Sequence, residues 1–281
     1  MKTIAGKTVL LIGASRGIGV FIARALAIKQ ANVVCVSRSK AGLDKVYAQI
    51  KAAGGKGLIV PFDISKLKEL PMLVQQINQL AGPIDILINN AAIEKYSAFK
   101  DYSTADLQSV LSTNLLSAME LTRLVLPSMV SQGSGHIVNI ASLASKKGAP
   151  YNSIYSASKA GLIMWTDAMR QELSGTNVGV SVICPGYVSQ VGMSFDTGVP
   201  APSFAGTSTP MDVASAVLRA IKQNKAEVIV NQNHITESLT RVLFAIGQLS
   251  PGFADALYRW FSVAKLNKIR AGNQMHSENI L

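Results

Sequence analysis

Tyr155 and Lys159 lie four residues apart in the segment 151–159, which reads YNSIYSASK. Four residues span about one turn of an α-helix, so both side chains would stand on one helix face. A phenol has a reference pKa of about 10, and a neighbouring ammonium group favours its phenolate form. The pair therefore predicts a general acid or base, although an ordinary exposed helix pair has the same spacing.

Ser142 lies thirteen residues before Tyr155 and follows an apolar run. A strand that ends at this point would offer the serine hydroxyl to a bound carbonyl or alcohol. Ser142, Tyr155 and Lys159 would then act on the same small molecule.

A glycine-rich turn, GASRGIG at residues 13–19, separates the apolar run Thr8–Ile12 from an apolar helical pattern. Glycines permit a tight turn and let a phosphate approach the free N–H groups of a helix N-terminus. The placement after a first strand favours phosphate binding over an ordinary strand–helix turn. The expected contacts are Gly13, Ser15, Arg16, Gly17, Ile18 and Gly19.

The segment after the second expected strand reads Ser37-Arg38-Ser39-Lys40 and has no carboxylate. Domains that bind NAD commonly place an acidic residue here for the ribose hydroxyls. Arg38 could instead bind a 2′-phosphate, with hydroxyls from Ser37 or Ser39 and with Arg16 closing from the glycine turn. This predicts NADP(H); the alternative is that Arg38 and Lys40 are solvated loop charges.

The composition indicates one large folded domain: 281 residues, 48% of them apolar and only 15% charged. Cys35 and Cys184 are far apart in apolar runs, which fits core residues in a reducing compartment rather than a metal site. With no secretory signal, we expect a cytoplasmic location, with peripheral contact at a membrane surface left open. The net charge of +11 fits cofactor phosphates or a membrane surface, while no aromatic-basic motif supports a nucleic-acid partner.

Strand-like apolar runs alternate with helical patterns over the first two-thirds of the chain, which predicts βαβ units. Continuous Val/Ile/Leu runs are typical of strands covered on both faces. We therefore expect an α/β fold, a Rossmann-type doubly wound parallel sheet of about seven strands with helices on both faces, spanning residues 1–232. The expected strands are Thr8–Ile12, Asn32–Ser37, Gly57–Phe62, Ile84–Asn89, Gly135–Ile140, Val178–Cys184 and Glu227–Val230. The expected helices are Ile18–Lys29, Leu43–Ala53, Lys66–Leu80, Ser103–Met129, Ser153–Leu173 and Met211–Asn224.

Residues 233–281 form an expected helical extension, with helices at Ile235–Ile246 and Pro251–Lys268. The second is amphipathic, with aromatic residues and basic edges. Such a helix could lie on a membrane surface, cover a substrate pocket or contact a partner subunit. Neither helix could span a bilayer, because residues 247–252 interrupt the apolar run.

Six motifs, in this order and spacing, together resemble the short-chain dehydrogenase/reductase family over roughly residues 5 to 230. They are Gly13-x-x-x-Gly17-x-Gly19, Asn89-Asn90-Ala91-Ala92, Asn114, Ser142, Tyr155-x-x-x-Lys159 and Pro185-Gly186. The resemblance implies hydride transfer between a nicotinamide and a carbonyl or alcohol. Tyr155 is similar to the family's general acid or base, and Lys159 to the residue that lowers its pKa and binds the nicotinamide ribose. Ser142 would polarise the substrate, and Asn114 would hold a water of a proton relay.

The resemblance also implies further cofactor contacts. Asp63, with Ile64 beside it, is similar to the residue that contacts the adenine, although it could also be a helix N-cap. Asn90 and Ala91 would line the cofactor, and Pro185, Gly186 and Val188 would pack beside the nicotinamide.

Three residues depart from the family pattern: Ile12 for threonine, Ala92 for glycine and Gln190 for threonine. In the family pattern, the threonine at the last of these positions hydrogen-bonds the carboxamide of the nicotinamide. In this chain, Ser189 or Gln190 itself would have to take that role.

The segment Tyr187–Pro210 would set the substrate, either as a mobile lid or as a disordered loop. Its Met193, Phe195, Val199 and Phe204, with Ile93, Leu143 and Tyr151, predict an apolar pocket. We therefore expect an enzyme that reduces an apolar ketone or oxidises a secondary alcohol. The alternatives are a regulatory dinucleotide-binding protein and a membrane-associated scaffold. The resemblance further implies a homodimer or homotetramer built on the helices expected at Ser103–Met129 and Ser153–Leu173.

Overall fold

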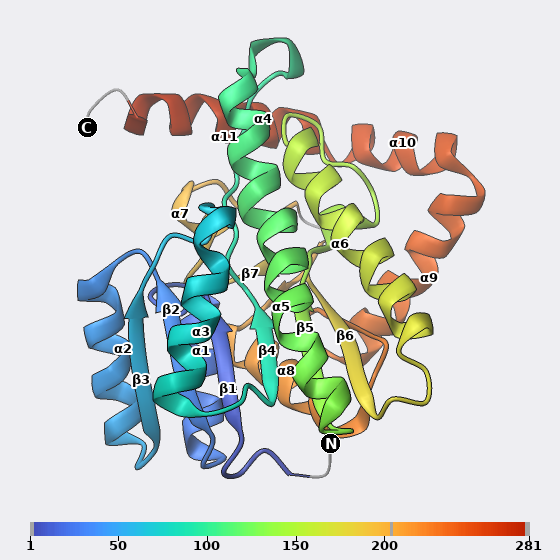
Figure 1. Cartoon of the computed structure of the whole chain (residues 1–281). Coiled ribbons are helices and arrows are strands. Elements are labelled where there is room, and N and C mark those ends of the chain that lie inside the picture. Colours follow the sequence, from blue (N-terminus) through green and yellow to red (C-terminus); the bar gives the residue numbers. More distant parts are fainter. Residues whose placement is uncertain (1–2, 203–204, 279–281) are drawn as a thin grey trace.

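A parallel sheet of seven strands forms the centre of the computed structural model, which describes residues 3–202 and 205–278 (Figure 1). The strand order is β3-β2-β1-β4-β5-β6-β9, and every neighbouring pair is parallel. The order reverses between β1 and β4, which is where folds of this kind bind ligands, beyond the carboxyl ends of the strands. The predicted doubly wound sheet is confirmed. The strands are β1 Thr8–Ile12, β2 Asn32–Ser37, β3 Lys56–Pro61, β4 Ile86–Asn89, β5 Gly135–Ile140, β6 Val178–Pro185 and β9 Glu227–Val230.

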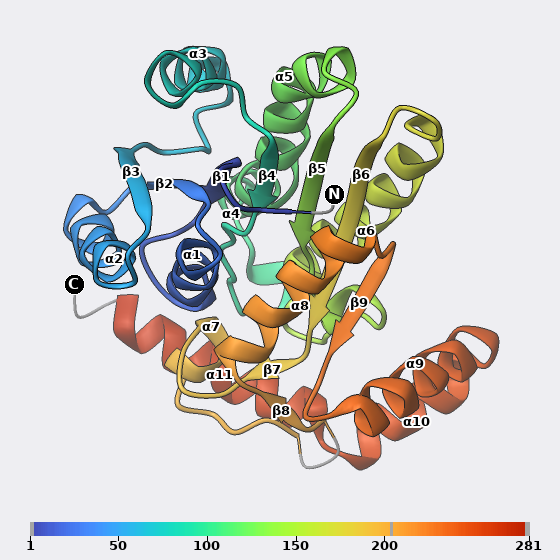
Figure 2. The same cartoon turned by 90° about the horizontal axis from the view of Figure 1, so that it is seen from below.

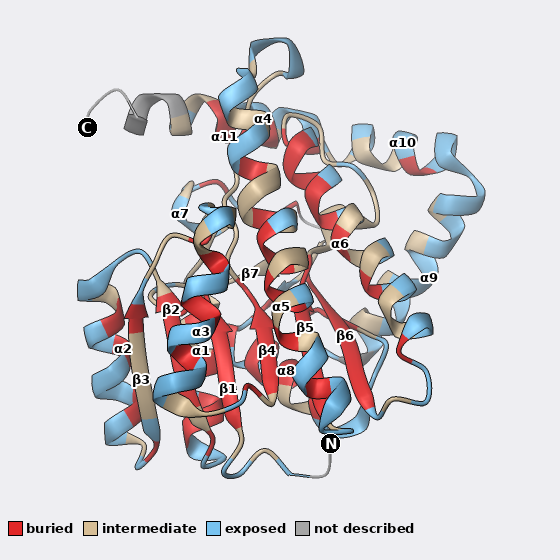
Figure 3. Cartoon of the chain, in the orientation of Figure 1, coloured by how far each residue is buried: buried red, intermediate tan, exposed pale blue. Residues whose placement is uncertain are grey.

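Helices cover both faces of the sheet (Figure 2). Alternate residues of β1 show this: Val9 and Leu11 pack into one apolar cluster, while Leu10 and Ile12 pack into the cluster on the other face. Both sets are buried, and Figure 3 shows the same for the neighbouring strands apart from β3, which explains the continuous apolar runs in the sequence. The first face is covered by α1 Ile18–Ile28, α2 Lys40–Ala52 and α8 Pro210–Gln223, and the second by α3 Leu70–Ala81, α5 Ser117–Ser131 and α6 Ser153–Glu172.

A buried chain of amide side chains fixes α6 against the sheet. Asn89 Nδ2 at the end of β4 donates to Asn139 Oδ1 in β5 at 2.8 Å, and Asn139 Nδ2 donates to Thr166 Oγ1 in α6 at 2.8 Å. Buried polar groups must be paired, so this chain specifies one position of the helix relative to the two strands. The helix that carries Tyr155 and Lys159 is positioned in this way.

The segment between β6 and α8 has secondary structure of its own in its described part. Strand β7 (Tyr187–Val188) pairs in parallel with β8 (Thr207–Ser208), and the short helix α7 (Met193–Asp196) lies between them. Phe204, expected to line the pocket, lies outside the described residues. Single-turn helices occur at η1 Leu67–Glu69, η2 Phe99–Asp101 and η4 Leu143–Ser145.

The C-terminal extension contains three helices, α9 His234–Leu249, α10 Pro251–Trp260 and α11 Val263–Glu278. The single helix expected over Pro251–Lys268 is therefore wrong. The chain turns at Ser262, whose φ of 53° lies in the left-handed region, and no glycine or proline in the sequence marks this turn. Among the described residues, no helix has the length and apolar character needed to cross a membrane.

Helix α11 crosses the carboxyl-end side of the sheet (Figure 1) and is held there by Arg270, which has no exposed area. Arg270 Nη1 donates to Asn267 Oδ1 at 2.6 Å, and Nη2 donates to the carbonyl oxygen of Pro200 at 2.8 Å. Its guanidinium lies 5.2 Å from the Tyr187 ring and 5.9 Å from the Tyr96 ring. One buried cation thus joins the end of the chain to the segment after β6 and to the loop after β4.

Arg270→Ala should destabilise the protein by about 3 kcal/mol, because it leaves buried carbonyl groups unpaired and a cavity between two rings. Denaturant unfolding would measure the loss, and hydrogen exchange should rise first in residues 193–202. The matched change Arg123→Ala removes an exposed guanidinium that pairs with Glu120, and it should leave unfolding almost unchanged. Equal effects of the two changes would contradict the role of Arg270.

Candidate active site

One cavity of about 790 Å³ opens at the carboxyl ends of the strands and takes in most of the predicted site. Only Gly19, Ser39 and Asn114 of the predicted site residues are missing from its lining. Gly19 and Asn114 contact segments that do line the cavity, and Ser39 directly follows Arg38 of the lining. A Cβ at Gly19 would come within 2.1 Å of the Gly13 carbonyl oxygen, and Ser39 Oγ accepts the Gly42 N–H at 3.1 Å to cap α2.

Asn114 lies in a π-helical turn, Ser112–Leu116, which divides the helix expected over Ser103–Met129 into α4 (Thr104–Leu111) and α5. Its Oδ1 accepts the Ile93 N–H at 2.8 Å, and its Nδ2 donates to the Ile93 carbonyl at 2.9 Å and to Ser158 Oγ at 3.1 Å. A widened turn of this kind is frequent at functional sites. The side chain therefore fixes the loop after β4 beside α6, and its amide atoms are used in doing so.

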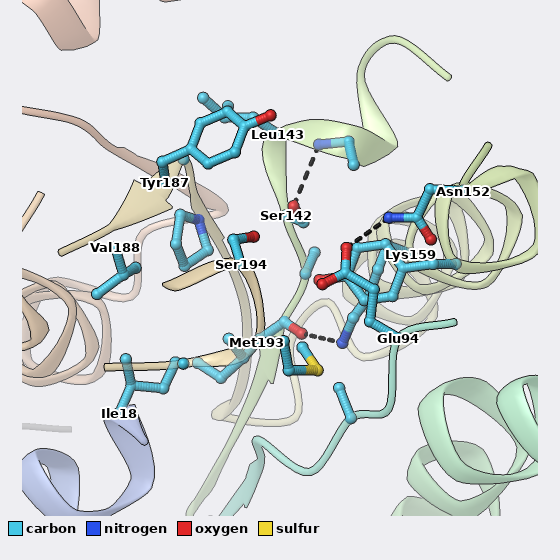
Figure 4. Close-up of a pocket in the computed structure, with 18 of the residues that line it drawn as sticks. Ile18, Glu94, Ser142, Leu143, Asn152, Lys159, Tyr187, Val188, Met193 and Ser194 are labelled. Atoms are coloured by element: carbon cyan, nitrogen blue, oxygen red, sulfur yellow. Dashed lines mark hydrogen bonds between the residues drawn. The ribbon is translucent and has the colours of Figure 1, made fainter. Parts of the chain in front are cut away.

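Ser142, Tyr155 and Lys159 meet where β5 ends beside the first turns of α6. Lys159 Nζ donates to the Ile140 carbonyl at 2.7 Å and lies 5.8 Å from the centre of the Tyr155 ring. Ser142 lies between this group and Tyr187 on the opposite wall (Figure 4). The predicted trio is thus brought together, and both Tyr155 and Lys159 are buried.

Burial dominates the protonation of both groups. It raises the pKa of Tyr155, the negative charge of Glu94 raises it further, and a hydrogen bond with Ser142 opposes the rise. Burial lowers the pKa of Lys159 to about 8, against the opposing effect of Glu94. The pKa of Tyr155 is therefore raised, not lowered as its spacing from Lys159 led us to expect. Removing the phenol from water disfavours its charged form and is the largest cause of the rise.

Glu94 is a residue of this site that the sequence motifs did not indicate. It follows β4 and lies in the cavity wall beside Lys159, where its carboxylate accepts a hydrogen bond from Asn152 Nδ2 (Figure 4). Burial raises its pKa, while hydrogen bonds from Tyr96 and Asn152 and the positive charges of Arg270 and Lys159 oppose the rise. The sequence feature that could have indicated Glu94 is a single carboxylate shortly after a buried strand.

The glycine turn has no room for a side chain at Gly13 or Gly19. Gly13 has a φ of 76°, and a Cβ there would come within 2.6 Å of the Ala91 backbone. Asn90 Nδ2 donates to the Gly13 carbonyl at 2.8 Å, while its buried Oδ1 has no partner among the described residues. No side chain caps α1 at Gly17. Its first N–H groups and the unpaired Asn90 oxygen are the groups a dinucleotide would complete.

The region beyond β2 is basic on the cavity side. Arg38 lines the cavity beside Ser37, whose hydroxyl lies 2.6 Å from Ser15 Oγ. Arg16 is mostly exposed, and its guanidinium lies 3.7 Å from the Asp196 carboxylate in α7. The two cations and two hydroxyls thus border one part of the cavity.

Asp63 occupies the cavity wall but does not cap a helix, so that alternative is wrong. Its Oδ1 accepts the Ser65 N–H at 3.0 Å and the Ser65 hydroxyl at 2.8 Å, which closes a turn before η1 begins at Leu67. Burial alone would raise the pKa of Asp63, but the bonds from Ser65 and the charges of Arg38 and Lys66 lower it below its usual value.

The expected apolar pocket is confirmed in part. Ile93, Leu143 and Met193 line the cavity, whereas Tyr151 does not and Phe195 is 54% exposed. Of the two candidates for the carboxamide, Gln190 lines the cavity, while Ser189 Oγ donates to the Ser208 carbonyl at 3.1 Å.

Comparisons with known proteins agree with this geometry. The family model for short chain dehydrogenases matches residues 7–197. Ketoacyl reductase HetN of Nostoc sp. is 62% identical over 275 residues, 98% of this chain and 96% of that protein. An uncharacterized oxidoreductase of Staphylococcus aureus is 34% identical and covers 84% of this chain and 98% of its own length. The crystal structure of a metagenomic short-chain oxidoreductase in complex with NADP aligns with a TM-score of 0.71 and 29% identity, covering 82% of this chain and 99% of that chain. The chain therefore belongs to the short-chain dehydrogenase family, and it is an oxidoreductase that acts on carbonyl or hydroxyl groups.

Proposed function

We propose that this protein reduces the ketone of an apolar ketoacyl compound with NADPH. The observation that carries the proposal is the meeting of Ser142, Tyr155 and Lys159 in one cavity, which the glycine turn borders on one side and apolar side chains border on another. The name of the 62% identical relative, a ketoacyl reductase, supports the substrate class.

The cofactor proposal rests on the groups around the cleft. The N–H groups at the start of α1 could donate hydrogen bonds to the pyrophosphate of the cofactor. The unpaired Oδ1 of Asn90 could accept a hydrogen bond from the part of the cofactor next to it. Arg38, Ser37 and Ser15 offer a cation and hydroxyls to a 2′-phosphate. When bound, NADPH supplies the hydride.

In this proposal, the chain's own residues bind the ketone and move one proton. The Ser142 hydroxyl donates to the ketone oxygen and holds it beside the Tyr155 phenol. As the carbonyl carbon is reduced, the phenol gives its proton to the developing alkoxide. The phenol is protonated at neutral pH, as a proton donor must be. The Lys159 ammonium then stabilises the phenolate that remains, and Asn114 fixes the adjoining loop.

Tyr155→Phe should lower kcat at least about 100-fold, because it removes the proton donor. NADPH oxidation with a 3-ketoacyl thioester measures this loss, and NADPH fluorescence should show nearly unchanged cofactor affinity. Tyr151→Phe is the control, since this phenol lies outside the cavity lining and its loss should leave turnover intact. Full activity in Tyr155→Phe would refute the mechanism.

Arg38→Asp should weaken NADPH binding about 10- to 100-fold and spare NADH, because it replaces a charge-assisted contact with repulsion. Titration of each cofactor gives the ratio of dissociation constants. Lys40→Asp makes the same charge change two residues away, where the lysine already pairs with Asp44 at 2.9 Å, and should leave that ratio in place. An unchanged ratio in Arg38→Asp would show that another group reads the phosphate.

Reductase activity should fall as pH rises through about 8, where Lys159 loses its charge. Glu94→Gln should move this fall to lower pH, because the Glu94 carboxylate raises the pKa of Lys159. Profiles of kcat against pH test this, with Glu120→Gln, which alters a half-buried carboxylate paired with Arg123 outside the cavity lining, as the control. A profile that does not move in Glu94→Gln would mean that Glu94 carries no charge over this range.

A further inference from the structure

One face of each of α9 and α10 turns toward the cavity rather than toward a packed core. The lining residues recur at intervals of three and four, which places them on a single face of each helix. In α9 they are Thr240, Leu243, Phe244 and Gly247, and from α10 onward they are Ala254, Leu257, Tyr258 and Phe261. None of these residues is charged.

The two helices come together at Gly247 and Ala254. A Cβ at Gly247 would lie 3.1 Å from the Ala254 Cβ, so the small residues let the helices approach closely. Beyond this contact the apolar faces border the same cavity that Ser142 and Tyr155 line. Apolar helix faces of this kind are normally buried against a core, and here they enclose a space that continues from the catalytic residues.

Polar contacts fasten the extension along its edges. Lys147 forms an ion pair with Asp255 of α10, and its ammonium lies 5.8 Å from the centre of the Tyr258 ring. Arg241 of α9 lies 3.4 Å from the Glu227 carboxylate in β9. These contacts hold both helices in place without filling the space beneath them.

We propose that α9 and α10 form the wall of a binding site for a long alkyl chain, which holds the tail of the substrate while its ketone lies at Tyr155. The site rests on the proposed function for its reactive end. Its occupant follows from the faces of α9 and α10, which offer aliphatic and aromatic carbon and no charge, while the two lysines of the adjoining lining, Lys146 and Lys147, already pair with Glu227 and Asp255. Leu243 lines the cavity and is also 50% exposed, so the cavity opens to the surface beside α9, where the far end of the alkyl chain emerges.

The first test is the dependence of turnover on chain length, with N-acetylcysteamine thioesters of four-carbon and longer 3-ketoacyl chains. Each methylene that enters the site should raise kcat/KM about fourfold until the space is filled. Leu257→Trp fills the site and should remove this preference, so that kcat/KM for the long-chain compounds falls to the value for the four-carbon compound. Leu243→Trp is a second such variant, at a position where half the side chain is already exposed.

The matched control is Leu249→Trp, which makes the same substitution on α9 at a side chain that is 88% exposed. It should keep the wild-type preference for long chains. Circular dichroism and NADPH affinity show that each variant retains its fold and its cofactor site.

The second test measures binding without turnover, using cis-parinaric acid, a fluorescent long-chain fatty acid, in the presence of NADP⁺. The probe should bind the wild type and Leu249→Trp, and at least about tenfold more weakly to Leu257→Trp, which corresponds to losing two buried methylenes. No binding to the wild type, or equal binding to all three proteins, overturns the site. Probe binding without reduction of any thioester would refute the proposed function and leave the chain site standing. Reduction of the thioesters without a preference for long chains would refute the alkyl-chain site and leave the proposed function standing.

Discussion

The need to cover both faces of a parallel sheet governs this molecule. Every strand of the main sheet but β3 is almost wholly buried. The apolar side chains on the two faces of β1 pack into two separate clusters. Polar chemistry is therefore confined to the ends of the strands. At the carboxyl ends, the glycine turn after β1, the Asn90 loop after β4 and Ser142 after β5 come together, because these three strands are neighbours in the sheet.

The charged side chains inside the cavity are shielded from water, so their protonation depends mainly on one another. Lys159 is buried, and burial lowers its pKa, while Glu94 opposes that effect and in turn raises the pKa of Tyr155. Removing one such group changes the protonation of the others, since their interactions are weakly screened. The balance leaves a protonated phenol beside an ammonium group, which is the state that a proton donor requires.

The last three helices of the described chain lie beyond residues 7–197, which the family model matches, and they border the cavity. Arg270 ties α11 to the segment after β6, and the ion pair of Lys147 with Asp255 fastens α10. Helices α9 and α10 then meet the space above the catalytic residues with uncharged faces. The C-terminal helices thus add an apolar wall to a site whose reacting groups come from the end of β5 and from α6.

Local patterns were enough to predict the sheet, most of its helices and the meeting of Ser142 with Tyr155 and Lys159, but not the π-helical turn that divides α4 from α5. Strand type, glycine spacing and helical spacing depend on neighbouring residues, and parallel strands bring their ends to one edge whatever their loops do. The turn at Ser262, the place of Glu94 and the direction of the Tyr155 pKa shift came only from the tertiary structure. The protonation of Glu94 and Tyr155 depends on burial and on charges from segments far apart in the chain, and no local pattern records how much water folding removes from a given side chain.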